Sequence, residues 1–188
     1  LIFLLTCSAT VAANFYATRL KVSDRVIEEK TRSLADQAIK DNLTNLKNRT
    51  ALSYEVAAQL KLMRKGMSKG FSILFIDLDR FKEVNDQLGH DAGDAVLVAA
   101  ADRIQSMLRP TDVACRLGGD EFAVLLSDLS SPSDADRIRD RILEALERPV
   151  LFEESYATVG ASIGLVTNLD VPSEPEAALQ QADVAMYL

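Results

Sequence analysis

The apolar residues of the chain fall into short runs typical of strands and longer periodic stretches typical of helices. Segment 71–79 is apolar on both faces until it closes in acids, which predicts a central buried strand. Segments 113–117 and 121–127 are strand-like, with little between them except Gly118 and Gly119. This arrangement predicts a hairpin with a tight glycine turn.

Helical spacing of apolar residues fills most of the remaining sequence. The predicted helices cover residues 50–68, 81–87, 93–108, 132–148 and 175–187. The first helix has a buried face made by Leu52, Val56, Leu60 and Met63. Residues 150–167 predict one long strand or a second hairpin. Together these elements predict a single α/β (α+β) domain, in which helices flank a central, mostly antiparallel sheet.

The first residues of the chain have a different character. Residues 1–18 carry no charge and are followed at once by Arg19, Lys21 and Arg25, which predicts the end of a transmembrane helix with a cytoplasmic basic flank. A buried helix or a secretory signal remnant is the alternative. Because the chain begins with Leu1 rather than Met, we expect it to be a piece of a longer protein.

A charged, helix-permissive segment follows at residues 19–40. Leu20, Ile27 and Leu34 recur there at intervals of seven, which predicts a linker helix with a parallel coiled-coil seam. An ordinary solvated connector helix is the alternative. The asparagine-rich stretch that follows breaks the pattern, so we expect the globular domain to cover 41–188.

Composition narrows the classes of partner. The chain has 188 residues, 48% of them hydrophobic, which is enough to bury one sizeable core. Its formal net charge of -7 argues against a nucleic-acid partner, because that binding depends on Lys and Arg. This net negative charge is still compatible with a phosphate-bearing substrate if a metal ion supplies positive charge at the site. Cys7 and Cys115 lack metal-ligand spacing, and we expect free thiols in a reducing compartment.

Acidic residues gather at two places that one sheet edge can bring together. Asp77 and Asp79 end the predicted central strand and, because strand side chains alternate, share one face. Asp120 and Glu121 directly follow the glycine turn. Magnesium prefers oxygen ligands and is usually held by one or two carboxylates plus substrate phosphates. If strand and hairpin are neighbours, the acids predict a Mg²⁺ site; surface acids at strand ends are the alternative.

The segments around these acids carry a family resemblance. Residues 116–126, Arg-Leu-Gly-Gly-Asp-Glu-Phe-Ala-Val-Leu-Leu, resemble the signature of the GGDEF-type diguanylate cyclases. Upstream, residues 75–86 and 89–94 resemble the family's metal and guanine segments in the right order and spacing. Residues 41–49 resemble its lead-in motif. The likeness covers about 41–188 and implies a fold similar to nucleotidyl cyclases and the polymerase palm.

Two details concern the ends of this resemblance. Asn45 stands where the family usually has Gly, and since Asn tolerates positive φ, we expect the tight turn to form. Residues 182–187 resemble the family's closing helix. Because the family continues with a lysine and an arginine that reach the triphosphate, we expect the domain to be truncated at Leu188.

The resemblance implies a metal site and a set of catalytic residues. Asp77, the backbone carbonyl of Leu78 and Asp120 are implied to hold Mg²⁺, with Mn²⁺ as an alternative. Glu121 is implied beside them as a second-metal ligand or base. A two-metal site stabilises the attacking and departing oxygens of an in-line displacement. Lys82 is implied to neutralise charge that develops on the phosphates, and its alternative is a solvated lysine.

Further residues are implied to bind the nucleotide. The backbone amides of Arg80 and Phe81 would cradle phosphates, as a helix N-terminus does. Asn85 and Asp94 fit a guanine reader, because an amide can meet O6 and N7 while a carboxylate accepts from N1–H and the exocyclic amine. Taken alone, these two residues would read as caps of neighbouring helices.

Two other positions bear on regulation and catalysis. Arg109 and Asp112 resemble the R-x-x-D inhibitory site at which many family members bind their own product. A helix end followed by a proline-containing turn is the alternative. His90, the single histidine, is expected in the turn before the long helix, with a structural role rather than an acid–base one.

The function implied by the resemblance is that of a diguanylate cyclase, a nucleotidyltransferase. It would condense two GTP into cyclic di-GMP by attack of each 3'-hydroxyl on the other's α-phosphate, in a homodimer inhibited by product. The expected location is the bacterial inner membrane, with a cytoplasmic catalytic domain. The alternatives are a non-catalytic module that binds GTP or cyclic di-GMP in a larger signalling protein such as a phosphodiesterase, and a purely structural dimerisation domain.

Overall fold

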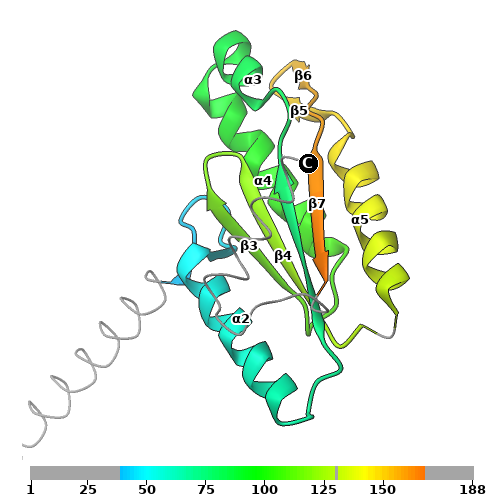
Figure 1. The fold of residues 1–188 in the computed structure, drawn as a ribbon. Helices are drawn as coiled ribbons and strands as arrows, with labels where there is room; N and C mark the ends of the chain where they lie inside the picture. The colour runs from blue at the N-terminus through cyan, green and yellow to red at the C-terminus, as the bar shows by residue number, and fades with distance from the viewer. Residues whose placement is uncertain (1–38, 130, 168–188) are drawn as a thin grey trace, which may run out of the picture. The chain divides into compact units, whose positions relative to one another are not determined.

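A five-stranded sheet forms the centre of the protein (Figure 1). The computed structural model describes residues 39–129 and 131–167. The sheet order is β1-β3-β4-β2-β7, with the strands β1 (Lys47–Asn48), β2 (Phe71–Asp77), β3 (Val113–Gly118), β4 (Glu121–Ser127) and β7 (Ser162–Thr167). β1 pairs in parallel with β3, and the other neighbours are antiparallel. The predicted mostly antiparallel sheet is therefore confirmed.

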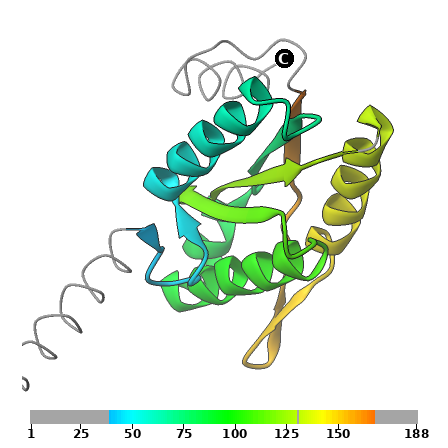
Figure 2. The ribbon, with the colours of Figure 1, turned by 90° about the horizontal axis from the view of Figure 1, so that it is seen from below.

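Helices cover both faces of this sheet. They are α2 (Arg49–Arg64), α3 (Phe81–Leu88), α4 (His90–Ser106) and α5 (Pro132–Leu146). Helix α2 lies on one face, and α4 and α5 lie on the other (Figure 2). A separate two-stranded hairpin consists of β5 (Val150–Phe152) and β6 (Ser155–Ala157). Residues 150–167 thus form a hairpin and, in addition, a strand of the main sheet.

The alternation of side chains along β2 and β4 produces two separate apolar cores. Phe71, Ile73 and Phe75 of β2 pack towards α2, together with Ala123 and Leu125 of β4. The intervening residues of both strands face α4 and α5: Leu74, Ile76, Phe122, Val124 and Leu126. Burial on both faces explains why β2 is apolar at every position except Ser72 and Asp77. Each fully buried large side chain contributes roughly 1.5–3 kcal/mol.

Two predicted helix boundaries were wrong by several residues. Helix α4 begins at His90 rather than at Gly93, so His90 is the first helical residue and not part of a turn. Gly89, at φ 88°, is the single residue between α3 and α4. Helix α2 ends at Arg64 rather than Ser68, because Gly66 adopts φ 66° and donates its N–H to the Met63 carbonyl at 2.9 Å.

Some predictions fall on residues that the structure does not describe. These are the transmembrane segment 1–18, most of the linker helix 19–40, the last helix 175–187, Cys7 and the chain end at Leu188. Within residues 39–129 and 131–167, no helix is long and apolar enough to cross a membrane.

Candidate active site at the end of the central strands

The acids of the central strand and of the glycine turn lie at the same end of neighbouring strands. Asp77 of β2 is the register partner of Glu121 of β4. Both continue the alternation that points towards α2, so the two carboxylates share one face of the sheet. The N–H of Leu78 donates to the Asp120 carbonyl at 3.3 Å, which ties the turn to the end of β2. Asp77, Asp120 and Glu121 are all half-buried.

The electrostatics of this cluster favour a bound cation. Partial burial raises the pKa of Asp77 above its ordinary value, and the negative charges of Asp120 and Asp79 raise it further. In the described part of the chain, no group of three or more His, Cys, Asp or Glu side chains is arranged to hold a metal ion alone. The oxygen donors of Asp77, Asp120 and Glu121 are of the type that divalent cations such as Mg²⁺ accept, usually one or two carboxylates together with substrate phosphates.

The raised pKa of Asp77 leads to a prediction about stability. In metal-free protein at pH 7, Asp77→Asn is expected to raise the melting temperature by about 2 °C, because the amide removes a charge that burial and Asp120 disfavour. The folded state binds this proton more tightly than the unfolded state, so the stability that Asp77 itself contributes is lost as pH rises from about 3.8 through the raised pKa. Thermal unfolding of the wild type and of Asp77→Asn, in EDTA at pH 7 and at pH 3, measures the difference in melting temperature at each pH.

The stability gain should disappear at pH 3, where the carboxyl group is protonated in the folded and unfolded states alike. Asp102→Asn, which changes an exposed acid on α4, serves as the control and should leave the melting temperature unchanged. A lower melting temperature for Asp77→Asn at pH 7 would show that Asp77 is not repelled.

Asp79 is hydrogen-bonded to Gly160 and to Ser162, the first residue of β7. Strand β2 ends at Asp77, so the alternation argument does not extend to Asp79. Its carboxylate accepts a hydrogen bond from Ser162 Oγ at 2.9 Å, and its N–H donates to the Gly160 carbonyl at 3.0 Å. A Cβ at Gly160 would lie 3.1 Å from Asp79 Oδ2 and 3.3 Å from Asp79 Cβ, so a larger residue there would require Asp79 to shift slightly.

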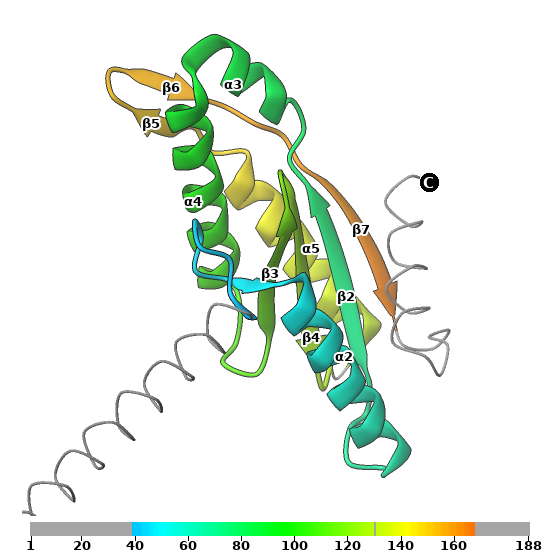
Figure 3. The ribbon, with the colours of Figure 1, turned by 90° about the vertical axis from the view of Figure 1, so that its left-hand side faces the viewer.

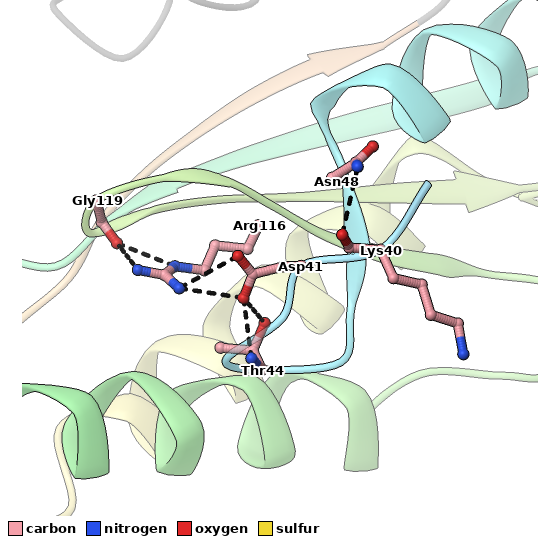
Figure 4. Close-up of polar contacts among 6 residues, drawn as sticks. All are labelled: Lys40, Asp41, Thr44, Asn48, Arg116 and Gly119. Atoms are coloured by element: carbon pink, nitrogen blue, oxygen red, sulfur yellow. Dashed lines mark hydrogen bonds and ion pairs between the residues drawn. The ribbon is translucent and has the colours of Figure 1, made fainter. Parts of the chain in front are cut away.

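The glycine turn depends on a backbone that only glycine adopts readily. Gly118 has φ 144° and Gly119 has φ 53°. The guanidinium of Arg116 donates to the Gly119 carbonyl from Nε at 3.0 Å and from Nη2 at 2.8 Å. Its Nη1 donates to the carboxylate of Asp41 at 3.1 and 3.3 Å (Figure 4). Arg116 therefore joins the turn to the loop that precedes α2.

The predicted phosphate-binding residues lie where β2 passes into α3 (Figure 3). Arg80 is the N-cap of α3 and has φ 64°, a left-handed conformation that costs a non-glycine residue about 1–3 kcal/mol. The N–H of Phe81 donates to the Leu78 carbonyl at 3.3 Å, a long bond. Lys82 is exposed in the first turn of the helix. The strained backbone turns the chain sharply beside the acids.

The two predicted guanine readers come from adjacent helices. Asn85 is half-buried on α3, and Asp94 is exposed on α4. The Asn85 side chain packs directly over Gly93: a Cβ there would overlap Asn85 Oδ1 and lie 2.9 Å from its Cγ. Gly93 therefore makes room for the amide beside Asp94, a role that the sequence alone did not indicate.

The predicted inhibitory residues lie at the other end of the sheet. Asp112 precedes β3, whose first residue pairs with Leu125, far along β4 from the turn at Glu121. Asp112 Oδ2 accepts from the N–H of Arg109 at 3.0 Å, and Oδ1 accepts from the N–H of Ser127 at 3.2 Å. Arg109 is exposed. The carboxylate thus holds its own turn in place and retains further acceptor positions.

Sequence reasoning missed two ion pairs around the turn. Arg49, the first residue of α2, places Nη2 3.4 Å from Glu121 Oε2, and Arg116 binds Asp41. Both arginines lie in the motif segments but far from their partners in sequence. Asn45, as expected, adopts a positive φ of 58° in the loop that contains Asp41. The only sequence signal for these ion pairs was the position of Arg116, a strongly basic residue just before the Gly118-Gly119 turn.

Comparisons with known proteins show which family the chain belongs to. Residues 38–188 match the family described as "Diguanylate cyclase, GGDEF domain". The chain is 43% identical over 163 residues to diguanylate cyclase TpbB of Pseudomonas aeruginosa, covering 86% of this chain and 37% of TpbB. The chain therefore belongs to the GGDEF diguanylate cyclase domain family and spans little more than a third of that relative.

Solved structures support the same assignment. The GGDEF domain of TpbB from Pseudomonas aeruginosa matches with a TM-score of 0.74 and 44% identity, covering 79% of this chain and 86% of that one. The coiled coil and GGDEF domain of DgcB from Caulobacter crescentus, in complex with c-di-GMP, matches with a TM-score of 0.79 and 25% identity, covering 90% and 91%.

Proposed function

We propose that this domain is a diguanylate cyclase, which condenses two GTP into cyclic di-GMP and releases two pyrophosphates. The observation that carries the proposal is the pairing of Asp77 with Glu121 across β2 and β4, with Asp120 close enough to raise the pKa of Asp77. Membership of the GGDEF family and likeness to TpbB support it. Each 3'-hydroxyl attacks the α-phosphate of the other GTP, and pyrophosphate leaves.

In this proposal the acids form the metal site. Asp77, the Leu78 carbonyl, Asp120 and Glu121 hold Mg²⁺ or Mn²⁺, all through oxygen atoms. When bound, such ions stabilise charge on the attacking and departing oxygens of a phosphoryl displacement. The protein's own contribution is to present half-buried carboxylates whose mutual repulsion is relieved when a cation binds.

The neighbouring helices bind and orient the nucleotide. Lys82 lies in the first turn of α3 and neutralises phosphate charge, while the amides of Arg80 and Phe81 approach the phosphates. Asn85 and Asp94 select guanine, because adenine lacks the N1–H and 2-amino donors that a carboxylate accepts. Positioning the two reacting groups supplies much of the rate enhancement in such transfers.

The assembly and control of the enzyme are part of the proposal. Each domain holds one GTP, so two copies must face each other, and a homodimer is required. We propose that residues 19–40 form the linker that brings copies together and that residues 1–18 anchor the protein in the inner membrane. Arg109 and Asp112 bind cyclic di-GMP as inhibitor; the solved structure of the relative DgcB is a complex with c-di-GMP.

The test is incubation of the intact protein with GTP and MgCl₂, scored for cyclic di-GMP by chromatography. We expect cyclic dinucleotide from GTP but not from ATP, and no product when EDTA removes the metal. Added cyclic di-GMP should slow turnover in the wild type and not in an Arg109→Ala variant. Binding of GTP with no product at any protein concentration would instead establish a regulatory, non-catalytic module.

A further inference from the structure

The loop that leads into α2 is fastened to itself by short-range hydrogen bonds. This lead-in loop comprises residues 40–48. Asp41 accepts from the N–H of Thr44 at 2.9 Å and from its hydroxyl at 2.7 Å, and the N–H of Asp41 donates to the Leu46 carbonyl at 2.8 Å. The loop is therefore a preformed unit, with the carboxylate of Asp41 held in one orientation.

The same loop is fastened to the strand that ends in the glycine turn. Its last residues form β1, and Lys47 pairs with Cys115 while Asn48 pairs with Arg116. Arg116 then spans the remaining distance, with Nη1 on the Asp41 carboxylate and with Nε and Nη2 on the Gly119 carbonyl (Figure 4). One guanidinium thus connects the lead-in loop to the turn that carries Asp120.

The physical chemistry of this connection makes it strong and directional. Arg116 and Asp41 side chains are only 11% and 23% exposed, so solvent and salt screen their attraction less than at an open surface. The pKa of Asp41 lies below its usual range: burial opposes this, but the hydrogen bonds from Thr44 and Arg116 outweigh it. A planar guanidinium that donates twice to one carbonyl fixes the direction of that carbonyl, as an ammonium cannot.

The turn needs such an external support. Gly118 and Gly119 both have positive φ, and glycine has the largest conformational freedom of any residue. Arg116 binds the carbonyl of the peptide group that links Gly119 to Asp120. The orientation of this peptide group therefore sets the position of the Asp120 backbone. A displacement of about 1 Å at a reacting centre can cost on the order of 10² in rate.

We propose that Arg116, anchored by Asp41, is a positioning residue that sets the placement of Asp120. This inference rests on the proposed cyclase function, in which Asp120 holds the metal.

Kinetics of the intact protein test the proposal. Asp41→Asn and Arg116→Lys should each lower kcat about tenfold, while the KM for GTP changes less than threefold, because the nucleotide-binding residues on α3 and α4 are untouched. The double variant should lose no more than the worse single variant, because both substitutions break one connection. Asp136→Asn, which removes the local and more exposed Asp136–Arg139 pair on α5, is the control for loss of an ion pair and should retain wild-type kcat.

Hydrogen exchange supplies a readout that does not depend on activity. In folded Asp41→Asn protein, the amides of residues 118–121 should exchange at least tenfold faster than in the wild type, and those of β2 should not change. Wild-type exchange in this turn, or an undiminished kcat in both variants, would overturn the inference. A wild-type protein that makes no cyclic di-GMP would overturn the proposed function, and faster exchange of the turn would then still support the positioning of Asp120 by Arg116.

Discussion

Replacing Asp120 by Asn is expected to lower cyclic di-GMP formation about 10³-fold, with little change in stability. The amide is nearly the same size and keeps the backbone contact of the turn, since it is the Asp120 carbonyl that accepts from the N–H of Leu78. It removes one of the negative charges that a divalent cation needs. Loss of metal stabilisation worth several kcal/mol, at about 1.36 kcal/mol per tenfold in rate, corresponds to this factor.

The assay is steady-state turnover of GTP at saturating MgCl₂, with melting temperature measured in parallel. Asp102→Asn, on the exposed side of α4, is the control for loss of one negative charge and should be fully active. If Asp120→Asn retained more than a tenth of wild-type turnover, Asp120 would not be a metal ligand in the reaction.

Replacing Gly93 by Ala is expected to raise the KM for GTP about 10- to 100-fold while kcat changes much less. The added Cβ would overlap Asn85 Oδ1, and since this atom ends a flexible side chain, the amide moves aside and the helix is kept. A well-placed amide contact to a base is worth about 1–3 kcal/mol, which sets the size of the effect.

A double-mutant comparison isolates the cause. If Gly93→Ala acts by displacing Asn85, then adding Asn85→Ala to it should raise KM by less than threefold more, although Asn85→Ala alone raises it as strongly. Inhibition constants for GDP and ADP give a second measure, and the preference for the guanine nucleotide should shrink in both variants. Fully additive effects of the two substitutions would show that Gly93 and Asn85 act separately.

Several features of the fold were readable from local sequence because local physics decides them. The run 71–77 is apolar on both faces. This pattern is needed only in a central strand that has helices packed on each side of it. Gly118-Gly119 between two β-branched and apolar runs predicted the hairpin, and Pro132 predicted the start of α5. Each of these signals depends on neighbours within a few residues.

The helix boundary at His90 was missed because glycine is ambiguous in sequence. Gly93 looked like the start of a helix, yet it lies inside α4, where the missing side chain admits Asn85 from α3. Gly89, which does separate the helices, adopts φ 88°. The two glycines have the same chemistry, and only the packing of α3 against α4 distinguishes them.

The sequence by itself determined the central strand and the neighbouring hairpin, the acids at their ends and the family to which the chain belongs. Only the tertiary structure decided how the acids are arranged. Asp77 and Glu121 are register partners on neighbouring strands, and the carboxylate of Asp79 accepts a hydrogen bond from Ser162. The tertiary structure alone revealed that Arg116 connects Gly119 to Asp41, 75 residues away along the chain. The physical reason is that periodicity and turn propensity act over a few residues, whereas ion pairs and register depend on segments that only folding brings together.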